Sequence, residues 1–422
     1  MEKAILVTLM FADRSDGWLA KDSSRELAAL AKSAGAQAAL ELTITMKSPQ
    51  SRMYMGPGQA DLIRREVEAA EADVVILNRD ISGTQQRNLE ELIGCKSIDR
   101  TQLILDIFAK RARSNEGKVQ VELAQLMYLM PRLAGKGIYL TRQGGGIGTR
   151  GPGEQKIETD RRRLRDRIVF LKKQLAQMQV RRESYRERRR EHDLPVVALV
   201  GYTNAGKSTL FNALTGSGVI AKDQLFSTLD STVRAFELPG APQRVMLVDT
   251  VGFLHLLPHH LIDAFKATLE EVMNADLLVH VIDVSDPNAI TLERSVRGIL
   301  EEMGAADKPM ITALNKSDRL DAADKTALKS TWKGGLWVSA ADGTGFEVLG
   351  KKIAGQLKSF CKEFRFVIPV RESQLIHAVY EQGKVLSRKD DGLTVSLRAA
   401  LPEAAGDAIR SRLKSLTKPA IR

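Results

Sequence analysis

One glycine-rich loop constrains the fold of this chain more than any other feature. The loop GYTNAGKS (201–208) follows an apolar run at 194–200 and precedes a helix-like stretch at 209–214. Its glycines permit a tight turn whose backbone N–H groups face phosphates, while Lys207 reaches the β and γ oxygens and the Ser208 hydroxyl ligates Mg²⁺. We therefore predict a strand, a phosphate-binding loop and a helix in succession. The predicted phosphate contacts are Gly201, Tyr202, Thr203, Asn204, Ala205, Gly206, Lys207, Ser208 and Thr209.

Three further motifs follow in the order that a guanine nucleotide site requires. A strand expected at 245–248 ends in Asp249, Thr250, Val251 and Gly252, where the aspartate can hold the Mg²⁺ shell and the glycine N–H can sense a γ-phosphate. A strand expected at 309–314 ends in Asn315, Lys316, Ser317 and Asp318. The aspartate can accept from N1–H and N2–H₂ of guanine, a donor pair that adenine lacks.

A last strand, expected at 336–339, leads into Ser339, Ala340 and Ala341, whose backbone can close over the guanine carbonyl. Each motif alone is a weak signal, and Asn-Lys-x-Asp could be a surface turn. Four motifs in order within positions 201–341 predict a guanine nucleotide site.

The motifs and their spacing resemble the translation-factor-related class of P-loop GTPases. Over the whole chain, GGGIGTRGPGE, the basic helix after it, GYTNAGKST and DTVGF resemble the HflX family of ribosome-associated GTPases. The resemblance implies that Phe226, Ser227, Thr228, Leu229 and Asp230 form the first switch. Thr228 would then ligate Mg²⁺ beside Ser208, with Asp249 acting through water. Ser231 stands where the family is expected to carry proline, a change that leaves the magnesium ligand untouched.

One position departs from the chemistry of signalling GTPases. Phe253 follows Gly252, where many of those enzymes carry a glutamine that orients the attacking water. We assign no catalytic residue with certainty and predict slow intrinsic hydrolysis, stimulated by a partner that orders the switches or by a cation. Asn204 matches the position that helps hold a monovalent ion in potassium-activated relatives, which suggests K⁺ as a second cofactor.

The positive charge of the chain is concentrated in one segment. The chain has 63 Lys and Arg, 52 Asp and Glu, and a net charge of +11. Thirteen basic residues and only five acidic ones lie between positions 160 and 192. Such a segment can bind a polyanion through phosphate neutralisation, or it can be a solvated helix face, and charge alone leaves both open.

Two apolar seams with 4-3 spacing flank a glycine-rich stretch. Because neither helix has a core of its own, an antiparallel hairpin is favoured over separate packing on neighbouring domains. Whether the first helix extends back through 101–114 stays open. The seams are Val119, Leu123, Leu126, Met130 and Leu133, then Leu164, Ile168, Leu171, Leu175 and Met178.

The stretch between the seams, 134–156, contains too many glycines for regular structure. We expect a mobile tip loop that carries positive charge into an anionic cavity, although composition alone also fits a disordered linker. The predicted RNA-facing residues are Gly144, Gly145, Gly146, Arg150, Gly151 and Gly153.

The predicted fold class is multidomain α/β. We expect an N-terminal α/β domain at 1–117, the hairpin at 118–192, a P-loop domain at 193–360 and a small C-terminal α+β domain at 361–422. A GPGQ turn at 56–59 is expected to start a helix rather than to bind phosphate. His255, His259 and His260 are expected to be polar surface rather than metal ligands.

Composition excludes several classes of protein. Cys95 and Cys361 lie far apart without a CxxC pattern, so neither a disulfide framework nor a zinc site is expected. No signal peptide and no apolar run of about 20 residues is found, so we expect a cytoplasmic protein without a transmembrane segment.

The family resemblance also implies the partners. They would be GTP and GDP, the large ribosomal subunit and ribosomal RNA, with DNA not expected and a monomeric state expected. The GTP form would bind the large subunit and split or rescue stalled ribosomes, and hydrolysis would release the factor. Two alternatives remain: a GTP-regulated RNA-binding module and an NTP-dependent RNA remodeller, neither dedicated to ribosomes. Asp318 argues against ATP at the P-loop site.

Overall fold

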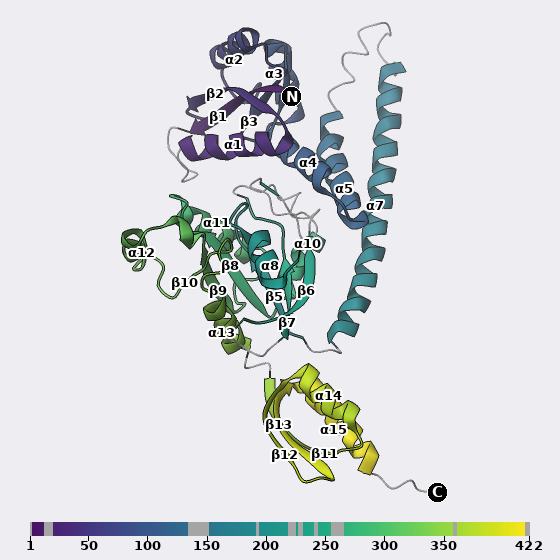
Figure 1. Ribbon diagram of the computed structural model, residues 1–422. Helices are drawn as coiled ribbons and strands as arrows, with labels where there is room; N and C mark the ends of the chain where they lie inside the picture. The colour runs from purple at the N-terminus through teal and green to yellow at the C-terminus, as the bar shows by residue number, and fades with distance from the viewer. Residues whose placement is uncertain are drawn as a thin grey trace. The chain divides into compact units, whose positions relative to one another are not determined.

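The computed structural model describes residues 2–11, 20–133, 152–190, 194–217, 225–226, 231–239, 244–254, 266–357 and 361–417. The chain forms two compact units (Figure 1). The first comprises Met1–Met178, Lys222–Asp230 and Leu257–Lys266, and the second comprises Gln179–Ala221, Ser231–Leu256 and Ala267–Arg422. Within the described residues, no helix is both long enough and apolar enough to cross a membrane.

The first unit begins with a parallel sheet whose strand order is β2-β1-β3-β4. Almost every residue of the two central strands is buried, as expected when helices cover both faces of a parallel sheet. This confirms the predicted N-terminal α/β fold. The strands are β1 (Lys3–Phe11), β2 (Gln37–Met46), β3 (Val74–Leu77) and β4 (Lys96–Ile98), and the helices are α1 (Ala20–Ala34), α2 (Pro57–Ala70) and α3 (Gly83–Ile93).

The GPGQ turn starts α2, as predicted. Gly56 is the N-cap, Pro57 occupies the first turn, and the Gly56 N–H donates to Gln59 Oε1 at 3.0 Å. Proline suits this position because the N–H it lacks would have no intrahelical partner.

Two separate helices follow the sheet, so the helix that carries the first apolar seam does not extend back through residues 101–114. Helix α4 (Arg100–Arg111) ends at Ala112, and α5 (Asn115–Arg132) begins after Ser114. The Gly117 N–H donates to Ser114 Oγ at 2.8 Å, so Ser114 is the N-cap of α5.

Helices α5 and α7 (Pro152–Arg190) run side by side in opposite directions, which confirms the predicted hairpin (Figure 1). Their apolar seams form one core, and an exposed ion pair between Arg167 and Glu122 joins them at 2.7 and 2.9 Å. The buried members of this core are Val119, Leu123, Ile168 and Leu171, with Leu126, Met130, Leu175 and Met178 packed against them.

The predicted extent of the tip loop was wrong at one end. Helix α7 begins at Pro152, so residues 152–156, including Gly153, are helical. Proline is well placed in a first helical turn, and Glu154, Gln155 and Lys156 favour helix. Gly144, Gly145, Gly146, Arg150 and Gly151 lie outside the described residues.

The second unit contains a six-stranded sheet of order β10-β9-β8-β5-β7-β6, in which only β6 is antiparallel to its neighbour. Every strand predicted for this domain is present, although β10 is shorter than expected. The strands are β5 (Val196–Val200), β6 (Thr232–Glu237), β7 (Arg244–Asp249), β8 (Leu277–Asp283), β9 (Met310–Asn315) and β10 (Leu336–Trp337). The helices are α8 (Lys207–Thr215), α10 (Lys266–Met273), α11 (Ala289–Glu302), α12 (Ala322–Leu328) and α13 (Phe346–Gln356).

The C-terminal part is a three-stranded antiparallel sheet of order β11-β13-β12. Alternate residues such as Phe364, Phe366 and Leu397 pack in its core, so the predicted α+β domain is confirmed. Its elements are β11 (Cys361–Pro369), α14 (Ser373–Gln382), β12 (Lys384–Asp390), β13 (Thr394–Pro402) and α15 (Glu403–Thr417).

Candidate nucleotide site

The glycine-rich loop joins β5 to α8, as predicted, and its backbone leaves no room for side chains at two positions. Gly201 has φ +152°, and a Cβ there would lie 2.3 Å from the Val281 carbonyl oxygen. Gly206 has φ +93°, and a Cβ there would lie 2.2 Å from Asn315 Nδ2. Only glycine fits these positions. The loop therefore brings backbone N–H groups to the N-terminus of α8, where they can bind phosphate.

Lys207, at the start of α8, is the buried cation of the loop. Its Nζ donates to the carbonyl oxygens of Tyr202 at 2.8 Å and Gly201 at 3.1 Å. Burial lowers the pKa of Lys207 to about 8, while nearby Asp249 opposes the shift. An anionic phosphate would stabilise the charged form, so phosphate binding and protonation of Lys207 favour each other.

The segment after β7 packs directly against the loop. The Thr203 N–H donates to the Phe253 carbonyl at 2.8 Å, and the Phe253 N–H donates to the Gly201 carbonyl at 3.1 Å. A Cβ at Gly252 would lie 2.8 Å from Thr203 Cα, so the approach requires glycine. The predicted second-switch residues Asp249 to Gly252 are thus placed beside the phosphate loop.

Phe253 is 1% exposed, and its side chain belongs to the core. A buried phenyl ring offers no hydrogen bond to a water molecule at the phosphates. The structure therefore agrees with the absence of a water-orienting side chain at this position.

Two oxygen ligands suited to Mg²⁺ meet beside Lys207. Ser208 Oγ donates to Asp249 Oδ2 at 2.6 Å, and both residues are buried. Hydroxyl and carboxylate oxygens are the donors that hard divalent cations prefer, so the residues present fit Mg²⁺. Within the described residues, no group of three or more His, Cys, Asp or Glu could hold a metal. His255, His259 and His260 lie outside that part of the chain.

The predicted base-recognition residues lie together at the ends of β9 and β10. Ser339 Oγ donates to Asp318 Oδ1 at 2.7 Å, which orients the carboxylate, and the Ala340 N–H donates to Asn315 Oδ1 at 3.0 Å. The Ser317 N–H donates to the Val338 carbonyl at 3.2 Å and joins the two motifs. Ala341, the last predicted residue, is exposed next to Ala340.

Two contacts that the motifs do not reveal fix the position of this base side, and the first of them also ties it to the phosphate side. Asn315 Nδ2 donates to the Ala205 carbonyl at 2.8 Å, so one amide bridges the phosphate loop and the loop after β10. Lys316 has φ +60° and pairs with Asp283, at the end of β8, at 2.6 Å. Asp283 was missed because it belongs to no motif, although its position at the carboxyl end of a parallel strand was a usable signal.

Other predicted residues are placed only in part. Asn204 is exposed with φ +62°, and Thr209 lies in the first turn of α8. Of the predicted first switch, the structure describes Phe226, while Ser227, Thr228, Leu229 and Asp230 lie outside the described residues.

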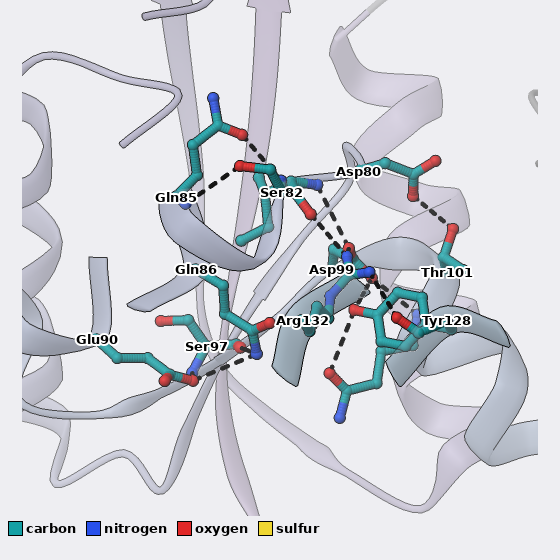
Figure 2. Close-up of polar contacts among 12 residues, drawn as sticks. Asp80, Ser82, Gln85, Gln86, Glu90, Ser97, Asp99, Thr101, Tyr128 and Arg132 are labelled. Carbon is teal, nitrogen blue, oxygen red and sulfur yellow. Dashed lines mark hydrogen bonds and ion pairs between the residues drawn. The ribbon is translucent and has the colours of Figure 1, made fainter. Parts of the chain in front are cut away.

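Sequence reasoning also missed a buried polar cluster in the first unit. We call Asp99, Tyr128 and Arg132 the Asp99 cluster (Figure 2). Asp99 has no solvent exposure and accepts from Tyr128 Oη at 2.9 Å and from the Arg132 guanidinium at 2.7 Å. Burial raises the pKa of Asp99 above its usual range, and burial likewise raises the pKa of Tyr128.

Arg132 makes further contacts at the end of α5. Its guanidinium donates to the Ile81 carbonyl at 2.6 Å and lies 3.4 Å from the centroid of the Tyr128 ring. A Cβ at Gly83 would lie 2.8 Å from Arg132 Cγ, so the start of α3 packs closely on the end of α5. The Asp99 cluster therefore fastens the last turn of α5 to the N-terminal sheet, immediately before the 134–151 segment.

The chain is similar in sequence to known GTP-binding proteins. Family models match three successive parts of the chain: a GTP-binding GTPase N-terminal region at 21–109, a GTP-binding GTPase middle region at 111–189 and a 50S ribosome-binding GTPase at 196–316. A crystal structure of a GTP-binding protein from Sulfolobus solfataricus in complex with GDP is 26% identical, with a TM-score of 0.44, over 85% of this chain and 99% of that chain.

Curated relatives match nearly the whole chain. GTPase HflX of Caldanaerobacter subterraneus subsp. tengcongensis is 44% identical over 94% of this chain and 90% of its own length. GTPase HflX of Escherichia coli is 42% identical over 95% of this chain and 94% of its own length. The resemblance read from the motifs is confirmed: the chain is a GTPase and belongs to the HflX family.

Proposed function

We propose that this GTPase binds the large ribosomal subunit in its GTP form and splits or rescues stalled ribosomes, with GTP hydrolysis releasing it. The observation that carries the proposal is the hairpin of α5 and α7. Its two helices bury their apolar seams against each other, and the glycine-rich residues 134–151 lie between the two helices in the sequence. The match of residues 196–316 to a 50S ribosome-binding GTPase supports the large subunit as the partner.

The outer surface of α7 has the charge that an RNA partner requires. The helix has 39 residues and is therefore about 58 Å long. Basic side chains along its described part are exposed, whereas Ile168 and Leu171 face α5. Such a surface binds RNA phosphates without reading bases, and its affinity falls steeply with salt. The exposed basic residues are Arg162, Arg163, Arg165, Arg167, Lys172, Lys173 and Arg181.

The nucleotide site would set how long the protein stays in its GTP form. Gly201 to Thr209 would hold the phosphates, Lys207 would neutralise β and γ oxygens, and Asp318 would select guanine over adenine. Ser208 and Thr228 would hold Mg²⁺ directly and Asp249 through water, and the bound ion would neutralise phosphate charge. Because Phe253 is buried and apolar, intrinsic hydrolysis would be slow, so the GTP form would persist until a partner orders the switches.

Potassium would be a second cofactor at Asn204, an exposed residue of the phosphate loop. The test is the GTPase rate in K⁺ and in Na⁺ at equal ionic strength. The proposal expects faster hydrolysis in K⁺, and equal rates would contradict it.

The effector role is tested by stiffening the glycine-rich segment. Gly144, Gly145, Gly146 and Gly151 are changed together to alanine, and Gly58→Ala with Gly298→Ala is the control because a Cβ at either of those positions meets nothing within 4 Å. GTP affinity should be retained in both variants, while ribosome splitting should be lost only when the segment is changed.

Unchanged splitting by the segment variant would refute the effector role. Salt-sensitive binding to any RNA, without preference for ribosomes, would instead favour a GTP-regulated RNA-binding module. ATP hydrolysis that survives Asp318→Asn would favour an RNA remodeller with a second nucleotide site.

A further inference from the structure

Phe226, the first residue of the predicted first switch, and Leu225 before it pack within the first unit. The Leu225 N–H donates to Ser33 Oγ on α1 at 3.1 Å, and that hydroxyl donates to the Ala29 carbonyl at 2.8 Å. The Phe226 ring meets Phe108 of α4 edge to face, with centroids 4.6 Å apart and planes at 78°. Leu225 is 8% exposed and Phe226 is 3% exposed, so both are seated between α1 and α4.

The backbone of Phe226 has an unusual conformation at this contact. Phe226 has φ +56°, a left-handed conformation that a bulky side chain rarely adopts. Such strain persists only where surrounding contacts over-determine it. Burial of the ring against Phe108 and the Leu225–Ser33 hydrogen bond supply those contacts, so Leu225 and Phe226 have a defined docked state.

Helix α4, which Phe226 contacts through Phe108, begins directly after Asp99 of the Asp99 cluster. Asp99 is the N-cap of α4 and accepts from the Gln102 N–H at 2.8 Å, while Phe108 lies near the other end of the helix. The two contacts are nine residues apart, or about 14 Å along the helix axis. Arg100 pairs with Glu26 of α1, and Lys110 Nζ donates to the Ala34 carbonyl, so α4 is fixed to α1 at both ends.

At its N-terminal end, α4 contacts the last turn of α5. Asp99 accepts from Tyr128 and Arg132, and Arg132 is two positions before residue 134, where the glycine-rich segment begins (Figure 2). One short helix thus contacts the switch segment at one end and the residues that lead into the tip at the other.

We infer that α4 couples the first switch to the root of the tip, by which we mean the last turn of α5 (Tyr128–Leu133). Packing of Phe226 on Phe108 is linked, through α4 and the Asp99 cluster, to the conformation of that turn. The inference rests on the proposed function, in which Thr228, two residues after Phe226, responds to the γ-phosphate and the 134–151 segment acts on the ribosome. Phe108, Ser33, Asp99 and Arg132 are then positioning residues for that action.

The test uses the full chain without ribosomes. Amide hydrogen exchange is measured at Tyr128–Leu133 with GDP and with a non-hydrolysable GTP analogue, both with Mg²⁺. The coupling predicts that the two nucleotides change the exchange rate there by about fivefold or more. Ser33→Ala and Phe108→Leu should each bring the two rates to within about twofold, because each weakens the seat of the switch segment.

Matched control variants distinguish a loss of coupling from general damage to the first unit. Ser24→Ala is on the same helix as Ser33, and Phe170→Leu removes an exposed ring of α7, so both should keep the wild-type difference. The inference would be overturned if the two nucleotides gave the same exchange rate in the wild-type protein. It would also be overturned if Ser33→Ala and Phe108→Leu kept the full difference in exchange rate seen in the wild type. Because ribosomes are absent, failure of the proposed ribosomal role would not alter this readout.

Thermodynamic linkage allows the same coupling to be measured in the opposite direction, from the last turn of α5 to the nucleotide site. If the switch biases the last turn of α5, a substitution that shifts the conformation of that turn must also shift the relative affinities for the GTP analogue and GDP. Arg132→Lys keeps a positive charge near Asp99 but loses the forked contact with Asp99 and the Ile81 carbonyl. It should shift the ratio of affinities for the GTP analogue and GDP by about fivefold or more. An unchanged ratio would contradict the coupling.

Discussion

The nucleotide site and the Asp99 cluster are both buried polar sites, yet they are assembled in different ways. In the nucleotide site, runs of consecutive residues follow β5, β7 and β9, and we propose that their backbone groups and a few side chains bind one nucleotide. In the Asp99 cluster, three side chains and the Ile81 carbonyl meet from positions up to 51 residues apart.

The difference explains which site leaves a signature in a sequence. A loop that binds through its backbone needs glycine at fixed spacing, because Gly201 and Gly206 have positive φ and no space for a Cβ. A cluster of side chains needs only compatible partners in the folded state. Asp99, Tyr128 and Arg132 therefore form no motif, although all three contact one another in the folded chain.

The largest expected effect is in the Asp99 cluster. Arg132→Ala would leave the fully buried Asp99 carboxylate without its cation and should lower the free energy of unfolding by about 3–5 kcal/mol. Denaturant-induced unfolding followed by circular dichroism measures the loss. Arg167→Ala, which removes the exposed ion pair with Glu122, is the matched control and should cost far less. Equal losses of unfolding free energy in the two variants would show that the Asp99 cluster stabilises the fold no more than an exposed ion pair does.

The next effect is in the phosphate loop. Gly206→Ala would place a Cβ 2.2 Å from Asn315 Nδ2 and should weaken GDP binding about a hundredfold, or roughly 3 kcal/mol. Fluorescent GDP titration measures the change. Gly216→Ala, at the other end of α8, has a similar positive φ but nothing within 4 Å, so it should bind GDP normally. If both variants bound GDP equally well, the steric account of the loop would be wrong.

A smaller effect is expected on the base side. Asp318→Asn would lose the charged acceptor for guanine and should weaken GTP binding about thirtyfold, in the range of a hydrogen bond to a charged group. Asp324→Asn, an exposed carboxylate on α12, serves as the control. Competition titrations with GTP and ATP measure both affinities, and undiminished GTP affinity in Asp318→Asn would remove this residue from guanine recognition.

The smallest effect is a dependence on pH. Because burial lowers the pKa of Lys207 to about 8, the free protein loses the ammonium charge as the pH rises through 8. Bound phosphate favours the charged form, so GDP affinity should fall about fourfold between pH 7 and 8.5. Fluorescent GDP titration across this range tests the prediction, and constant affinity would show that phosphate binding does not depend on the charge of Lys207.

The sequence predicts the four strands β5, β7, β9 and β10 because each is an apolar run that leads into a nucleotide-binding motif. It did not predict β4, whose three residues are too few for a pattern, nor β6 and β8, which lead into none of the predicted motifs. It also extended the tip loop to residue 156, because Gly153 was given more weight than the helix-starting Pro152. Within the nucleotide site, the motifs predict which residues take part. They do not predict that Asn315 also bonds to the Ala205 carbonyl, because that contact depends on how two loops pack.

Phe226 shows the same limit more clearly. Its position in the switch motif is visible in the sequence, but its seat against Phe108 requires two segments more than 100 residues apart to meet. Tertiary packing of this kind depends on shape and burial and leaves no local pattern.

The central claim is tested most directly by sedimentation of intact ribosomes through a sucrose gradient after incubation with the protein and either GDP or a non-hydrolysable GTP analogue. The account predicts that the analogue alone brings the protein onto large subunits and depletes intact ribosomes, so that GTP binding drives splitting and hydrolysis serves release. Protein that stays at the top of the gradient with both nucleotides would contradict the account.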